Sequence, residues 1–247
     1  MKKSKILFSA ASILSNLLVV TGVFADQTQT ATSSSAETPV TVTLNAPTTT
    51  TPKAPTDPTD PTKGGNEETP GGTIGENGKL GIAYYPKTFT FTGNLGKDTL
   101  MLHDSSNSMS SNATYNVGVK DETRQNNQWT LTAQLIWNEN ALPGSTITVT
   151  NPNKGNVMKN TNNGTDEFQT SNLVSQNDVQ GTVSNVVTIN TVGSTEIMKK
   201  GQGMVGKGTY DYCLGTLGSL QLTIPNAMNL EAKTYSGNVN WNLSVTP

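Results

Sequence analysis

Apolar and polar residues alternate along most of the second half of the chain. In the stretch 128–137, one face carries Trp129, Leu131, Ala133, Leu135 and Trp137, and Gln128, Thr130, Thr132 and Gln134 lie on the other. A period of two places successive side chains on opposite faces of a β-strand. The pattern therefore predicts a strand with one apolar face, and no stretch after residue 78 shows the sustained period of a helix.

The same alternation recurs in shorter stretches that are bounded by Gly, Pro, Asn and Ser. These stretches are Leu80–Tyr84, Phe89–Phe91, Tyr115–Val119, Ile147–Val149, Leu220–Ile224 and Val239–Val245. About 170 residues with this texture have the size of one all-β domain. We therefore predict an all-β fold, a single β-sandwich or barrel-like domain, over residues 79–247.

A segment of different composition precedes this domain. Residues 26–78 contain no aromatic residue, seven of the twelve prolines, and seven acidic side chains against two lysines, a net charge of −5. Such a segment buries too little apolar surface to offset the entropy of ordering it. We predict a disordered, Pro/Thr-rich stalk with polyproline II character. The alternation of Val40, Val42 and Leu44 leaves open a short strand that docks on the domain.

Residues 1–25 have the features of a secretory signal peptide. Three lysines precede an apolar run over residues 6–20, and Val23-Phe24-Ala25 suits a signal peptidase that cleaves between Ala25 and Asp26. A transmembrane anchor is the alternative, but the run is shorter than the roughly 20 residues that span a bilayer, and polar residues interrupt it. We expect a secreted chain with no membrane span in its mature part.

Cysteine usage and the C-terminal residues bear on how the mature chain is held. Cys213 is the only cysteine, which excludes an intrachain disulfide, and no cysteine follows the signal to carry a lipid. The last residues contain no LPxTG motif and no apolar tail. We therefore expect the protein to be released or held non-covalently.

The predicted domain is electrically neutral. Residues 79–247 carry 11 basic and 11 acidic side chains. Affinity for nucleic acid comes mainly from Lys and Arg that meet phosphates, so nucleic acid is a poor candidate partner. Simple electrostatic capture by anionic wall polymers is disfavoured for the same reason.

Two Trp-x-Leu tripeptides lie far apart in this domain. Trp129-Thr130-Leu131 follows the run Val119-Lys120-Asp121-Glu122-Thr123-Arg124, and Trp241-Asn242-Leu243 follows Leu222-Thr223-Ile224-Pro225 and Tyr235. Together these motifs resemble the WxL-domain family of Gram-positive surface proteins, over Leu80 to Pro247. The resemblance implies non-covalent attachment to the cell wall, with peptidoglycan as the proposed ligand and other surface proteins as partners. Cys213 is unusual for such a domain.

The residues of the two tripeptides allow two interpretations. Trp129 and Leu131 share one strand face, as do Trp241 and Leu243. The neighbours on those faces are Leu, Ala and Val, which favours core positions for both tryptophans. The alternative is an exposed platform on which sugar rings stack. In the first case the motif reports the fold, and the binding surface lies elsewhere.

Catalytic and cofactor motifs are weak in this sequence. Gly201–Gly206 fits the GxGxxG fingerprint, but no helical pattern follows it, so we expect a flexible loop rather than a dinucleotide site. His103 is the only histidine; a triad would need its neighbour Asp104 and a remote serine, and a solvated loop position is favoured. Metal sites such as zinc need several His or Cys ligands, so we expect no metal and no cofactor.

Two acidic pairs are the remaining candidates for chemistry. Asp121-Glu122 and Asp166-Glu167 are possible acid/base pairs of a glycosidase, but both lie in polar, turn-like stretches, and we expect solvated loops. Arg124 is a possible partner that pairs with Asp121 before the first Trp strand.

Three functions remain open: a wall-binding protein held by peptidoglycan, a subunit of a surface complex held by partner proteins, and a wall-active hydrolase. The weak catalytic motifs count against the third. We therefore predict a non-enzymatic protein of the cell surface and cell wall.

Overall fold

The computed structural model describes residues 42–44, 51–55, 67–68, 79–105, 114–150 and 155–246. The chain divides into one unit of residues 1–43 and a second of residues 44–247, and the account below concerns the second. The predicted signal peptide, with Ala25 and Asp26, lies outside the described residues. Val42–Leu44, the described part of the possible docking strand, forms no strand, and Val42 and Leu44 are exposed.

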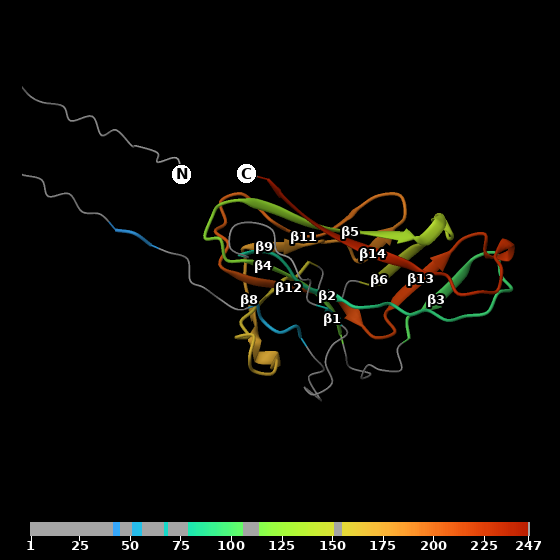
Figure 1. The fold of residues 1–247 in the computed structure, drawn as a ribbon, viewed down its shortest axis with the longest axis horizontal. Helices are drawn as coiled ribbons and strands as arrows, with labels where there is room; N and C mark the ends of the chain where they lie inside the picture. The colour runs from blue at the N-terminus through green and yellow to red at the C-terminus, as the bar shows by residue number, and fades with distance from the viewer. Residues whose placement is uncertain are drawn as a thin grey trace, which may run out of the picture. The chain divides into compact units, whose positions relative to one another are not determined.

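The described part of the chain consists of β-strands and short 3-10 turns (Figure 1). In chain order the strands are β1 (Glu67–Glu68), β2 (Leu80–Pro86), β3 (Leu100–His103), β4 (Thr114–Asp121), β5 (Gln128–Trp137), β6 (Thr146–Thr150), β7 (Met158–Asn160), β8 (Leu173–Ser175), β9 (Val179–Gly181), β10 (Val186–Asn190), β11 (Thr195–Lys200), β12 (Gly208–Thr216), β13 (Leu220–Ile224) and β14 (Gly237–Thr246). The 3-10 turns are η2 (Asn138–Asn140), η3 (Thr170–Asn172) and η4 (Ala227–Asn229).

The strands form three antiparallel sheets around one core. Their orders are β1-β2-β4-β12-β7-β8, β10-β6-β13-β3 and β14-β5-β11-β9. All three contribute apolar side chains to the same cluster, for example Val117 of β4, Ile147 of β6 and Leu131 of β5. The prediction of an all-β fold is confirmed, with the core enclosed by three sheets.

The strands predicted from alternation are present, with one exception and several additions. Phe89–Phe91 is not a strand; Phe91 makes a single bridge to Asp104. β12 was not predicted from alternation; it lies inside the six-stranded sheet and is buried on both faces. Alternation failed there because the face of β12 away from the core is also covered, so Asp211 is buried like its apolar neighbours.

This second face of β4 and β12 carries a buried polar network. Tyr84 lies over Gly118, where a Cβ atom would come within 2.5 Å of the ring. The Tyr84 hydroxyl donates to Asp211 Oδ2 at 2.7 Å, and Asn116 Nδ2 donates to Asp211 Oδ1 at 2.8 Å. Because burial penalises the charged form, it raises the pKa of the Asp211 carboxyl to about 7.

Residues 51–55 of the predicted stalk dock beside this network. Pro52 and Pro55 are buried. Lys53 N donates to Asn162 Oδ1 at 3.0 Å, and Asn160 Nδ2 donates to Lys53 O at 2.8 Å. Asn160 Nδ2 also lies 3.2 Å from the Tyr84 hydroxyl, so one amide joins the docked segment to the network beneath it.

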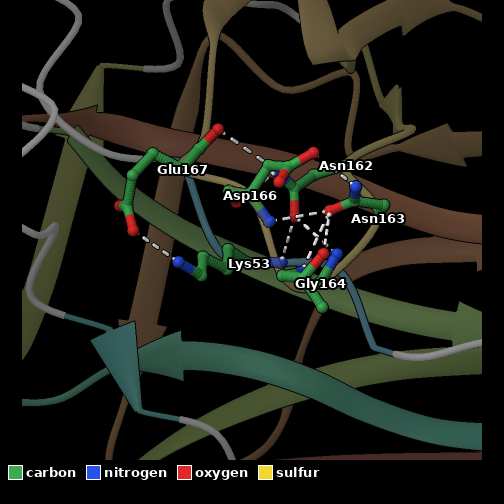
Figure 2. Close-up of polar contacts among 7 residues, drawn as sticks. Lys53, Asn162, Asn163, Gly164, Asp166 and Glu167 are labelled. Carbon is green, nitrogen blue, oxygen red and sulfur yellow. Dashed lines mark hydrogen bonds and ion pairs between the residues drawn. The ribbon is translucent and has the colours of Figure 1, made fainter.

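The loop that receives Lys53 is held by its own polar side chains (Figure 2). Asn162 Nδ2 donates to Asp166 O at 3.0 Å, and Asn163 Nδ2 donates to Asp166 Oδ2 at 2.6 Å. Figure 2 also shows the Lys53 ammonium directed at the Glu167 carboxylate. The two groups form an ion pair, with Nζ 2.5 Å from Oε1. The loop is therefore a formed platform for the docked segment.

The docked residues modify the predicted organisation. They lie within residues 26–78, predicted to be a disordered stalk except for a possible strand at Val40–Leu44, as does β1, which pairs with β2. Two buried prolines and satisfied backbone groups compensate for the entropy of ordering residues 51–55. The disorder of the rest of the stalk and the boundary at residue 79 stay predictions.

A comparison of two shortened chains tests the docked segment. A chain that begins at Thr51 should match the full mature chain in thermal stability, whereas one that begins at Thr56 should lose about 1–2 kcal/mol, because it lacks the buried prolines and the backbone bonds of Lys53. The exposed ion pair with Glu167 adds little. Thermal melts of both chains check this; equal melting temperatures would show that the segment contributes nothing.

The Asp211 carboxyl should make the folded state less stable as the pH rises. Its pKa is about 7 in the folded chain against an ordinary value of 3.8, so between these values the folded state binds a proton that the unfolded state releases. The stabilisation from this bound proton is complete below pH 3.8 and is lost as the pH rises through about 7. Urea unfolding of the wild type and Asp211→Asn over this range measures the effect. The variant should show the flatter profile, and parallel profiles would contradict the assignment.

Candidate functional site

The two Trp-x-Leu tripeptides lie on neighbouring strands. β5 and β14 pair in antiparallel register, with Leu131 opposite Leu243 (Figure 1). Trp129 lies opposite Val245, on one side of this pair, and Trp241 lies opposite Ala133, on the other. The two tryptophans therefore share a sheet face but are at different places along it.

Trp129 is a core residue with a polar partner. Only 1% of its surface is exposed. Its indole Nε1 donates to Asp121 Oδ2 at 2.9 Å, and its ring packs against that of Tyr210 with centroids 6.1 Å apart. A buried indole N–H needs such an acceptor, so the first tripeptide depends on the carboxylate at the end of β4.

Asp121 is itself paired with a buried cation. Lys200 Nζ lies 2.6 Å from Asp121 Oδ2, and neither side chain has exposed surface. The same nitrogen donates to Asn127 Oδ1 at 2.7 Å and to Gln125 O at 3.2 Å. On the other carboxylate oxygen, Thr123 Oγ1 donates at 2.6 Å. The cluster thus fixes the loop between β4 and β5 against the end of β11.

These contacts correct two predictions about this loop. Asp121 is not solvated; it is buried, and Glu122 is only partly exposed, with burial raising the pKa of its carboxyl. Arg124 is not the partner of Asp121: it is exposed, and its backbone N–H donates to Gly206 O at 3.0 Å. Lys200 takes that role because the register of β11 on β5 places it opposite Trp129.

Trp241 is in a different environment. It is half-buried, and it lines a cleft of about 840 Å³. Apolar residues of two sheets contribute to the cleft: Leu100, Leu102, Leu135, Ile147, Leu222 and Ile224. The aromatic side chains that line it with Trp241 are Tyr85, Phe89, Phe91, Trp137 and Tyr235. The volume is within the range of about 300–1,000 Å³ typical of sites for small ligands.

Three segments of the chain build the cleft. They are residues 85–95 after β2, residues 230–236 before β14, and the first half of β14, which is an edge strand. Trp137 Nε1 donates to Ser145 Oγ at 2.7 Å, which fixes the indole, and the Tyr235 hydroxyl donates to Glu231 O at 3.0 Å. Two of the aromatic side chains that line the cleft are therefore held by hydrogen bonds.

The rim of the cleft is polar. Lys233 Nζ lies 5.4 Å from the centre of the Tyr235 ring and 3.0 Å from Glu231 Oε2. The carboxylate of Glu231 raises the pKa of the exposed Lys233 ammonium. Lys87, Asn94 and Asn238 also border the cleft. An apolar, aromatic interior with a polar rim suits a ligand that has both kinds of surface.

The structure separates the residues of the possible triad. His103 is exposed at the end of β3, with Nδ1 3.2 Å from Gly218 O. Asp104 is buried, and it accepts hydrogen bonds from the Tyr115 hydroxyl at 2.8 Å and from Leu220 N at 2.7 Å. The Asp104 carboxylate therefore links Tyr115 of β4 to Leu220 of β13, which is a structural role.

The remaining candidates are also structural. Gly201–Gly206 connects β11 to β12 without a helix, and Gly203 N donates to Asn126 Oδ1 at 2.7 Å. Asp166 and Glu167 belong to the loop that receives Lys53. Among the residues that the structure describes, no three His, Cys, Asp or Glu side chains form a metal-ligand cluster. In the same residues, no helix is long and apolar enough to cross a membrane.

Most of the cleft was not predicted from the sequence. Phe89, Phe91, Trp137 and Tyr235 were seen only as strand or motif residues, since they come from segments far apart in the chain. The available signal was their clustering near Gly, Pro and Asn, which marks connections.

Comparisons with known proteins agree with the motif. A family model described as the WxL domain, surface cell wall-binding, matches residues 31–247. No curated protein and no solved structure matches the chain significantly.

Truncating each tryptophan should have unequal effects. Trp129→Ala should cost about 3–5 kcal/mol, because it leaves a cavity in the core and removes a donor from Asp121. Trp241→Ala should cost about 1–2 kcal/mol, because the side chain already borders a cleft. Denaturant unfolding of both variants measures the difference, and equal losses would show that the two residues are equivalent.

Proposed function

The chain belongs to the WxL family of surface cell wall-binding domains, and from that membership we propose that it is a secreted protein that binds the peptidoglycan of a Gram-positive cell wall non-covalently. The family places it at the cell surface in association with the wall. The proposal adds the ligand, the route of export and the binding surface.

The observation that carries the proposal is the aromatic cleft beside the second tripeptide. Sugar rings have apolar faces that pack on aromatic rings, and hydroxyl and acetamido groups that need polar partners. Trp241, Trp137 and Phe91 supply the rings. Lys233 and Asn238 at the rim supply donors to carbonyl or carboxylate oxygens of the glycan or its peptide.

In this proposal the two tripeptides have different roles. Trp129 is buried and hydrogen-bonded to Asp121, so its role is to stabilise the fold. Trp241, on the neighbouring strand, reaches the cleft and acts on the ligand directly. The core and platform interpretations of the motif then each apply to one tryptophan.

We favour binding over hydrolysis because three of the four carboxylates in the two candidate acidic pairs, Asp121, Asp166 and Glu167, are already engaged. Asp121 is paired with buried Lys200, and Glu167 with Lys53. A hydrolase that acts on glycans needs two carboxyl groups that flank the bond to be cleaved. The cleft-lining residues include one acid, Glu231, whose carboxylate pairs with Lys233.

Binding to wall that has been stripped of protein tests the proposal. The wild-type chain should sediment with purified peptidoglycan sacculi, and Trp241→Ala and Phe91→Ala should each weaken binding about tenfold, equivalent to about 1.4 kcal/mol. Ile136→Ala is the matched control, because Ile136 is an exposed apolar residue of β5 that does not line the cleft. Tryptophan fluorescence should change with soluble peptidoglycan fragments for the wild type.

The outcomes separate the competing functions. Loss of binding in cleft variants that remain folded, with melting temperatures lowered only by the few degrees that a loss of about 1–2 kcal/mol implies, supports the cleft. Binding to whole wall but not to stripped sacculi would favour a subunit held by partner proteins. Release of soluble sugar from the sacculi would favour the hydrolase and overturn the proposal.

A further inference from the structure

The loop before β5 and the end of β11 bring an amine, a carboxamide and a carboxylate together. Lys200 Nζ lies 2.7 Å from Asn127 Oδ1 and 2.6 Å from Asp121 Oδ2. The Lys200 and Asp121 side chains have no exposed surface. The Trp129 indole donates to the same carboxylate oxygen at 2.9 Å, which fixes its direction.

We propose that Lys200 and Asn127 become joined by an amide bond in the folded protein, with Asp121 as the proton carrier. The Lys200 ammonium gives a proton to Asp121, and the free amine attacks Cγ of Asn127. A bond forms between Nζ and Cγ, and the bond between Cγ and the amide nitrogen of Asn127 breaks. Of the two protons lost by Nζ, one leaves with that nitrogen as ammonia and the other stays on Asp121, which ends as a neutral acid and needs no cation in the core. The reaction consumes no oxidant and no other reactant.

Burial favours the first step of this reaction. An isolated pair of charges is costly to keep away from water, and proton transfer over 2.6 Å converts it into a neutral amine and a neutral acid. A neutral amine is the nucleophilic form of lysine. Asn127, which carries the carbon that is attacked, is itself partly buried at the edge of this cluster.

Position favours the second step. The amine already contacts the oxygen bonded to the carbon that it attacks, and reactants held in place react as if at very high concentration. Asn127 is adjacent to β5, and Lys200 ends β11, paired in register with Trp129. Both backbones are therefore fixed by the same sheet while the side chains meet.

The bond would replace a disulfide in function. It closes a loop between residues 73 apart in the chain, and cross-links of that length restrict the unfolded state strongly. The chain has a single cysteine, so no intrachain disulfide can supply such a link. The bond would tie the strand that carries the first tripeptide to its neighbour.

Intact mass and peptide mapping of the full mature chain test the proposal. The mass should be lower than that of the sequence by about 17 Da, the mass of one ammonia. Trypsin should fail to cut after Lys200, and the digest should contain a branched peptide that joins Lys200 to Asn127. Asn127→Ala should restore the full mass and the cut. Lys199→Arg, which changes the exposed neighbouring lysine, should keep the loss.

The alternatives give different results. A loss of about 18 Da, one water, would mean that Asp121 rather than Asn127 acylates Lys200 and would overturn the assignment. A wild-type mass equal to that of the sequence, with a normal cut after Lys200, would leave the cluster an ion pair and overturn the proposal. Both readouts come from the wild-type chain, so they do not depend on whether a variant folds.

Discussion

A buried ion pair between Asp121 and Lys200 is the interaction on which the arrangement of the first tripeptide depends. Two charges without exposed surface are tolerated only when each meets a partner of opposite sign and its remaining hydrogen bonds are satisfied. Here Trp129, Thr123 and Asn127 complete the set. The pair therefore fixes a loop, two strands and an indole at once, and losing one partner would leave an unpaired charge in the core.

The same sheet presents a different surface at its other end. Along β5 and β14 the apolar face passes from the closed core around Trp129 to the open cleft around Trp241. The cleft is open there because β14 is an edge strand and the connections on either side supply aromatic rings rather than another strand. A rigid, closed end thus supports an accessible end, as a binding surface on a β-domain requires.

Local sequence patterns predicted the strands whose faces differ in polarity. Alternation identified β5 and β14 because one face of each meets the core and the other meets solvent. It failed at β12, where Asp211 is buried and hydrogen-bonded to the Tyr84 hydroxyl, so both faces are covered. The docking of Lys53 could not be predicted from local patterns either, because its partners Asn160 and Asn162 lie more than a hundred residues away.

The sequence by itself determined the all-β fold, the strands that carry the tripeptides and the family, because these depend on local periodicity and on short motifs. Only the tertiary structure decided that Asp121 is buried with Lys200, that Trp129 and Trp241 have different environments, and that a cleft forms beside the second. Those features depend on strand register and on contacts between distant segments. Identical tripeptide patterns can therefore occupy a core and a cleft, since burial is a property of the neighbours that folding brings together.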